Sequence, residues 1–215
     1  MSRFARLVAR DLARAWGGGG AALPVVFFLL VATLYPFAVG PDAALLARSG
    51  GGMLWVAALL AALLPVDRLV APDVASGVFD QFALRGIADE VSITAKLIAH
   101  WLSFAPALML AAVPASALLR LDGATLVRLE LGLLLGTPGL AALGMLVASL
   151  TAGLKGASAL TGLLMLPLAI PILIFGAGSL APVDGGALKL LAAASLILVA
   201  LTPFASGAAL RAGRE

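Results

Sequence analysis

The chain contains no cysteine among its 215 residues. This absence excludes a disulfide framework, a thiol nucleophile, an iron–sulfur cluster and any metal site with cysteine ligands. The chain has one histidine, His100, so an H-E-x-x-H zinc site is excluded as well. It also lacks the G-x-x-x-x-G-K-S/T loop with which most ATPases bind phosphate. We therefore expect no catalytic residues, no metal site and no cofactor bound by this chain itself.

Charged residues are scarce too. Only 12% of the residues are charged and 62% are hydrophobic, whereas an ordinary soluble domain is about 25% charged. A soluble fold of this size could not bury so much apolar surface in one core, because much of a small domain lies at its surface. The composition therefore predicts an all-α membrane protein whose apolar side chains are covered by lipid.

Six apolar runs are candidates for transmembrane helices, each of which needs about 20 residues. They lie at about 22–40, 53–66, 97–119, 131–152, 158–179 and 187–209. The second run is short, and its helix can extend back through Gly50–Gly52. Charged residues lie at the ends of these runs. Together the runs predict a single transmembrane domain over residues 1–215.

Positive charge is distributed unevenly between the two sides of a six-span chain. The side with both termini holds ten of the 14 lysines and arginines: Arg3, Arg6, Arg10, Arg14, Arg68, Arg85, Lys96, Lys155, Arg211 and Arg214. The other side holds Arg48, Arg120, Arg128 and Lys189. Because positively charged loops stay in the cytoplasm, this asymmetry predicts a multi-pass protein with both termini cytoplasmic.

Residues 2–16, before the first span, have the pattern of an amphipathic helix. Apolar residues occupy one face, and the four arginines of the segment occupy the other. A basic polar face of this kind is typical of a helix that lies in the headgroup plane of the membrane. The alternative is an unstructured, positively charged flank.

The longest hydrophilic stretch runs from Asp67 to Lys96, between the second and third spans. Within it Val74, Val78 and Phe82 recur every four residues beside Phe79, which predicts a short amphipathic helix over about 73–84. Its two phenylalanine side chains need to be covered. A partner protein is one candidate for this role, and the protein's own bundle is the other.

Proline and glycine occur inside the predicted spans. Proline removes a backbone donor and strains the preceding turn, so we expect helix breaks or kinks at Pro138, Pro167, Pro171 and Pro203. Gly132 and Gly136 form a G-x-x-x-G pair, which predicts close helix packing and would permit a homodimer. Such features suit a moving element, but static bundles contain them too.

His100 and Trp101 lie at the cytoplasmic start of the third span. One interpretation makes them a contact for haem, a metal or a lipid headgroup. The other, which we favour for a lone histidine, is a structural anchor in the aromatic belt of the membrane. Ion-coupled transporters place charged residues at mid-membrane depth, and the spans here carry none there. Any transport by this protein would therefore draw its energy from another subunit.

Several short stretches follow one another in an order and at a spacing that together are specific. They are Val39-Gly40-Pro41 with Leu45-Leu46-Ala47-Arg48, the run Trp55 to Leu60, Asp67-Arg68-Leu69, Gly77 with Asp80-Gln81, the run Ala95 to Trp101, Leu135-Gly136-Thr137-Pro138, the double-proline run Leu166 to Gly176, Pro182-Val183-Asp184-Gly185, and Pro203-Phe204-Ala205. On these residues the chain resembles the haem exporter protein B (CcmB) family, almost from end to end.

The resemblance implies a six-helix ABC-transporter permease bundle in the bacterial inner membrane. Such a bundle carries an N-terminal interfacial helix and a cytoplasmic coupling helix between spans two and three. The implied partners are an ABC ATPase subunit, other haem-handling membrane proteins of cytochrome c maturation and a periplasmic haem chaperone. The subunit would couple ATP hydrolysis by its partner to haem export or to release of the haem-loaded chaperone. An ABC permease for a lipid or glycan and a non-transporting membrane scaffold are the alternatives.

The resemblance also assigns residues to the ATPase contact. The family's pattern Gly-x-Leu-Glu-Gln corresponds to Gly77-Val78-Phe79-Asp80-Gln81, with Phe in place of Leu and Asp in place of Glu. The coupling helix is therefore expected to use Asp73, Val74, Gly77, Val78, Phe79, Asp80, Gln81 and Phe82.

Overall fold

The computed structural model describes residues 2–17, 20–154, 157–181 and 185–214. Lys155 and residues 182–184, which figured in the sequence patterns above, lie outside these ranges. Six of the described helices are long and apolar enough to cross a membrane, which confirms the predicted all-α, six-span fold. They are α2 (Ala22–Val39), α3 (Ala43–Leu63), α6 (Asp89–Leu118), α7 (Gly123–Thr151), α8 (Ala157–Gly178) and α9 (Gly186–Ala212).

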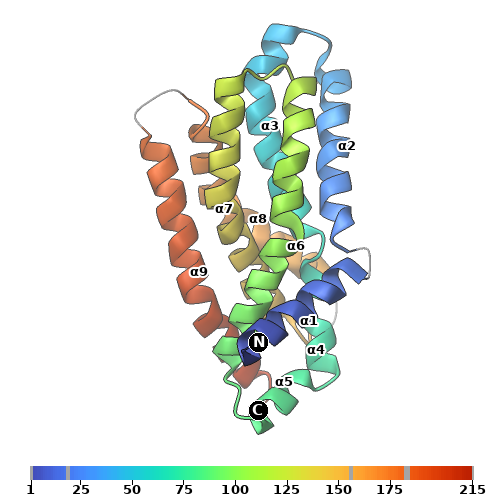
Figure 1. Ribbon diagram of the computed structural model, residues 1–215, viewed down its shortest axis with the longest axis vertical. Helices are drawn as coiled ribbons and strands as arrows, with labels where there is room; N and C mark the ends of the chain where they lie inside the picture. The colour runs from blue at the N-terminus through green and yellow to red at the C-terminus, as the bar shows by residue number, and fades with distance from the viewer. Residues whose placement is uncertain (1, 18–19, 155–156, 182–184, 215) are drawn as a thin grey trace.

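The six long helices run up and down side by side, and both termini lie at the same end of the bundle (Figure 1). This end also carries four shorter helices: α1 (Arg3–Gly17), η1 (Val66–Arg68), α4 (Ala71–Ala75) and α5 (Val78–Leu84). We call it the charged end, because the ion pairs described below gather there. Helix α1 crosses the bundle obliquely and packs on α6, in the position expected of a helix that lies along the membrane surface.

Three spans begin eight to ten residues before their predicted starts, at Ala43, Asp89 and Gly123. The predicted starts come after Arg48, Lys96 and Arg128, because charged residues were kept out of the spans, but all three residues lie inside continuous helices. Long basic side chains can reach polar surroundings while the backbone of the helix continues. The true starts of α3 and α7 carry aspartate caps, since Asp42 accepts hydrogen bonds from the amides of Ala44 and Leu45, and Asp122 accepts one from Thr125.

The fully buried indole ring of Trp55, on α3, lies in a cradle of three glycines. A Cβ atom would lie 3.0 Å from the ring at Gly132, and 2.6 Å from it at Gly136 and Gly176. We call these three residues the glycine cradle. The predicted role of Gly132 and Gly136 in close packing is therefore taken by a side chain of the same chain. Both glycines are buried, so they offer no surface to a second copy.

The helices continue through all four prolines that were expected to break them. Pro138 lies inside α7, Pro167 and Pro171 inside α8, and Pro203 inside α9. The helices are therefore not broken at these positions, and the alternative of kinks there stays a prediction. Each proline removes a single donor, and a membrane helix that keeps its remaining backbone hydrogen bonds tolerates that loss.

Candidate functional site at the charged end

The segment that connects α3 to α6 differs from the single helix predicted over residues 73–84. It forms two short helices, α4 and α5, which are separated at Ser76 and Gly77. Gly77 has φ 66°, a left-handed conformation that ends a helix and that glycine adopts without strain. The Ser76 hydroxyl donates to the carbonyl oxygen of Pro72 at 2.7 Å and closes the last turn of α4.

Both phenylalanines of α5 are buried against the chain's own bundle. Phe79 is 2% exposed and Phe82 is 8% exposed, and their rings meet edge to face at 6.5 Å. The guanidinium of Arg10, on α1, lies 5.0 Å from the centre of the Phe82 ring. The expectation that a partner protein covers these two side chains is therefore wrong. The apolar side chain that α5 presents outward is Leu84, which is 89% exposed.

A first ion cluster fastens α4 to α1 and α6. The carboxylate of Asp73 lies 2.6 Å from Lys96 Nζ, 2.9 Å from Arg14 Nη1 and 3.4 Å from Arg10 Nη2. Asp11 extends the cluster through Arg10 at 2.6 Å and Lys96 at 3.7 Å. Asp73, placed by the sequence on the ATPase contact, is buried and points inward instead. Part of the basic face of α1 is therefore used within the chain, because Arg10 and Arg14 pair with Asp73.

A second ion cluster fastens the end of α9 to the starts of α5 and α6. Arg214 Nη2 lies 2.6 Å from the buried carboxylate of Asp89, and Arg211 Nη1 lies 2.6 Å from Glu90. Arg214 also reaches Asp80 of α5 at 3.4 Å. The α4–α5 segment is thus tied at both halves, α4 by the first cluster and α5 by the second.

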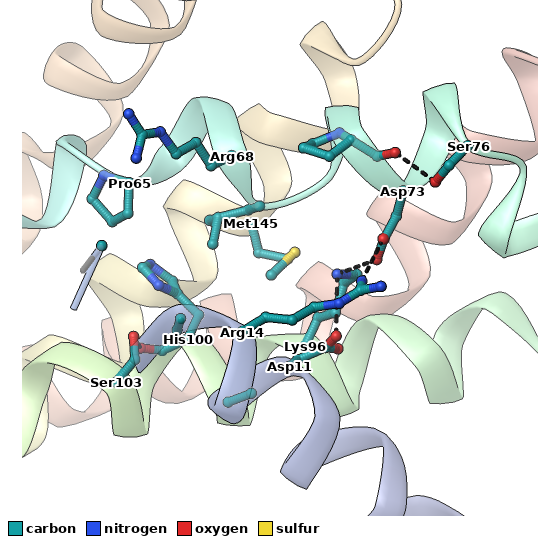
Figure 2. A pocket seen from close by; sticks show the side chains of 15 residues that line it. Asp11, Arg14, Pro65, Arg68, Asp73, Ser76, Lys96, His100, Ser103 and Met145 are labelled. Atoms are coloured by element: carbon teal, nitrogen blue, oxygen red, sulfur yellow. Dashed lines mark hydrogen bonds and ion pairs between the residues drawn. The ribbon is translucent and has the colours of Figure 1, made fainter. Parts of the chain in front are cut away.

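A cavity of about 400 Å³ lies between α1, the α3–α6 connection, α6 and α7 (Figure 2). It is lined by Asp11, Arg14, Ala15, Gly20, Pro65, Arg68, Leu69, Pro72, Asp73, Ser76, Lys96, Ala99, His100, Ser103 and Met145. The first ion cluster occupies one side of the cavity, whereas Arg68 and His100 lie on the other. The cavity therefore has one wall whose charges are paired and one wall with an imidazole and an arginine that has no ion pair with any described residue.

His100 is 4% exposed and faces this cavity rather than lipid. Its Nε2 atom has no hydrogen-bond partner among the described residues, and its ring packs 5.0 Å from that of Phe104. His100 is therefore not an anchor in the aromatic belt. Trp101 does not line the cavity, and its indole N–H donates to the hydroxyl of Thr137 at 3.0 Å, which joins α6 to α7.

The ion pairs of Asp11, Lys96 and the two C-terminal arginines were not predicted from the sequence. One signal was available, since Asp11 is the only acid in an otherwise basic segment. A lone acid among arginines indicates an inward ion pair better than it indicates a membrane surface. Nothing in the local pattern of Arg211 and Arg214 distinguishes an ion pair from a topology signal, because basic residues commonly flank spans.

Comparison with known proteins gives a match along the whole chain. The family model described as CcmB protein matches residues 2–213. The chain is 46% identical to heme exporter protein B of Rhodobacter capsulatus, over 95% of this chain and 97% of that protein. It is 44% identical to the Paracoccus denitrificans protein of the same name over the same shares. It is 40% identical to that of Escherichia coli K12, over 88% of this chain and 89% of the relative.

Proposed function

The chain belongs to the CcmB protein family, and on that premise we propose that it is a membrane subunit of the haem-export system of c-type cytochrome maturation. The name heme exporter protein B, carried by relatives at 40–46% identity, supports haem as the molecule that the system handles. The subunit is a non-catalytic, multi-pass permease of the bacterial inner membrane. An ABC ATPase partner binds ATP and supplies the energy.

The coupling of ATP hydrolysis to this subunit takes place at α5. Leu84 carries this assignment, because a leucine exposed to 89% at a polar, charged end of the molecule is an apolar contact without cover. Gln81 and Arg85 flank it on the exposed surface. The buried Phe79 and Phe82 have a different role, since they hold α5 to the bundle. A displacement of α5 at Leu84 is therefore transmitted to the transmembrane helices. Because α5 lies at the charged end and contacts the ATPase on the cytoplasmic side, the charged end is the cytoplasmic end.

The work done with that energy is a change of shape that releases a haem-loaded periplasmic chaperone. Haem iron is usually held by His, Met, Cys or Tyr. The sequence offers one His, one Tyr, five Met including the first residue, and no Cys, which is a poor supply of ligands for a path across the membrane. The two ion clusters supply what a mechanical role requires, because they connect α4 and α5 to α1, α6 and α9.

The assignment of Leu84 is tested with the variant Leu84→Asp, co-expressed with the ATPase subunit from the same organism. We expect this variant to insert normally and to lose co-purification of the ATPase. The matched control is Leu118→Asp, which changes an exposed leucine at the opposite end of α6 and should keep the ATPase bound. Phe79→Asp is unsuitable, because it places a charge in the core and disturbs folding. Retention of the ATPase by Leu84→Asp at the wild-type level would refute the assignment.

Two turnover measurements separate this function from its alternatives. ATPase turnover that depends on the presence of this chain distinguishes a permease from a membrane scaffold. Stimulation of that turnover by haem and by the haem chaperone distinguishes haem handling from export of a lipid or glycan. If turnover depends on this chain but is stimulated neither by haem nor by the haem chaperone, the permease role stands and the haem role is refuted.

A further inference from the structure

The cavity at the charged end has binding groups that neither ion cluster uses. Arg68 forms no ion pair with any described residue, and its side chain lines the cavity. The buried Nε2 atom of His100 also lacks a partner there. In one neutral tautomer this atom carries a hydrogen and can donate it. An unsatisfied buried polar group costs free energy, so a ligand that accepts this hydrogen bond would be stabilised.

The lining of the cavity has a positive balance. Three cations, Arg14, Arg68 and Lys96, face two carboxylates, Asp11 and Asp73. Both carboxylates already have cationic partners at 2.9 Å or less. Arg14 is the most exposed of the paired cations, with a side chain that is 58% exposed, and its guanidinium has further donors for a second anion. The cavity therefore suits a ligand with a compact negative charge.

The position of the cavity indicates where that anion comes from. One wall is formed by α1, the amphipathic helix that packs obliquely across the charged end (Figure 1). Such a helix lies at the depth of the lipid headgroups. The opposite wall includes the apolar side chains of Leu69 and Met145, which suit the glycerol and first methylene groups of a lipid. A cation, a buried donor and an apolar wall at this depth match a lipid headgroup better than a freely diffusing ion.

We propose that this cavity binds the phosphate group of a membrane phospholipid. Arg68 donates to the phosphate oxygens, because the guanidinium fork matches phosphate geometry. Arg14, on the opposite side of the cavity, adds positive charge to the lining. His100 donates from Nε2 to an oxygen deeper in the cavity. The bound lipid fills the space between α1 and the α3–α6 connection. This site does not depend on the partner ATPase or on haem.

The test measures phospholipid that stays bound to the full-length chain during detergent exchange, by native mass spectrometry. The chain is purified from membranes that contain phosphatidylethanolamine and phosphatidylglycerol. We expect one retained phospholipid in the wild type and roughly tenfold weaker retention in Arg68→Ala, because one charge-assisted hydrogen bond is lost. Arg68 is exposed and forms no ion pair among the residues that the structure describes, so this variant should fold. His100→Gln, which replaces the imidazole with a flexible amide, should weaken retention as well.

A matched control and a competition experiment make the result specific. Arg85→Ala removes another exposed arginine of the same connection that does not line the cavity, and it should retain the lipid like the wild type. Addition of inorganic phosphate distinguishes the two sources of the anion. Lipid retention that phosphate does not displace supports a headgroup site. A thermal shift with phosphate alone and no retained lipid would assign the same residues to a free phosphate, and the lipid source would be wrong.

Two results would overturn the proposal altogether. The first is equal retention of phospholipid in the wild type, Arg68→Ala and Arg85→Ala, which would mean that lipid binds elsewhere. The second is a purified wild-type chain in which the cavity binds added haem, seen by its absorption spectrum, and in which His100→Gln removes that signal. That result would make His100 a haem ligand instead of a headgroup contact.

Discussion

Lys96 Nζ lies 2.6 Å from the carboxylate of Asp73, and the two side chains are only 9% and 6% exposed. The pair joins α6 to α4, so a helix of only five residues is held by a buried charge. Asp73→Ala would leave Lys96 buried beside the more distant Asp11. Since breaking a buried pair on one side typically costs about 3–5 kcal/mol, we expect a loss of stability of that order. Thermal unfolding in detergent measures it.

Two further variants show whether this loss comes from the ion cluster. Lys96→Met should cost less than Asp73→Ala, because Asp73 keeps Arg14 at 2.9 Å. Asp67→Ala, an exposed acid of the same connection, should change stability by no more than about 0.5 kcal/mol. Equal destabilisation by all three variants would contradict a specific role for Asp73.

The glycine cradle predicts that adding a methyl group at one of its glycines lowers the stability of the protein. In Gly136→Ala the new methyl group would lie 2.6 Å from the Trp55 ring, and overpacking of this kind typically costs about 1–3 kcal/mol. Gly52→Ala is the control, because a Cβ at Gly52 meets no atom within 4 Å. It should be neutral or stabilising by up to about 1 kcal/mol, since alanine favours helix. In a Trp55→Phe background the penalty at position 136 should shrink, and an unchanged penalty would exclude the ring as its cause.

The second ion cluster predicts a difference between two neighbouring arginines. Arg214 lies 2.6 Å from the buried Asp89, whereas Arg211 lies 2.6 Å from the more exposed Glu90 and only 3.8 Å from Asp89. Arg214→Ala should destabilise the attachment of α9 by about 1–3 kcal/mol. Arg211→Ala should cost at most about 1 kcal/mol, as is usual for exposed pairs. Limited proteolysis of the C-terminus in detergent, with rates compared between the two variants, measures the difference, and equal rates would contradict it.

Membrane orientation can be tested directly because the chain has no cysteine of its own. Gln81→Cys and Ala124→Cys place single thiols at exposed positions at opposite ends of the bundle. A membrane-impermeant maleimide added to intact spheroplasts should label Ala124→Cys only. Both should be labelled after the membrane is opened. Labelling of Gln81→Cys in intact spheroplasts would reverse the proposed topology.

The number of spans was predictable, and their boundaries were less so, for a physical reason. A run of apolar residues measures contact with lipid, and lipid contact stops before the helix does. Lys96 shows this well, because the predicted span begins directly after it although it lies about a quarter of the way along a continuous 30-residue helix. Its charge is neutralised by Asp73 and Asp11, which are distant in sequence. A local sequence pattern cannot predict such partners.

The local pattern of residues 73–84 predicted which side chains pack together, but not what covers them. Periodicity predicted an apolar side with Phe79 and Phe82, and the structure confirms that the two residues share an environment. Periodicity cannot say whether a bundle or a partner provides it. Leu84 was overlooked because a single leucine near the end of a helix carries no pattern. The left-handed turn at Gly77, which separates α4 from α5, rotates the second helix relative to a continuous one.

The glycine cradle also constrains how this sequence can evolve. The Trp55 ring packs against three glycines on two other helices. The size of the side chain at each of these four positions therefore limits the size at the others. A larger residue at Gly136 or Gly176, where a Cβ would lie 2.6 Å from the ring, requires that the ring shift or that a smaller side chain replace Trp55. Where the ring does not shift, substitutions in this part of the bundle must arrive in a fixed order. Related sequences that have lost the tryptophan should be the ones that carry alanine or serine in the cradle.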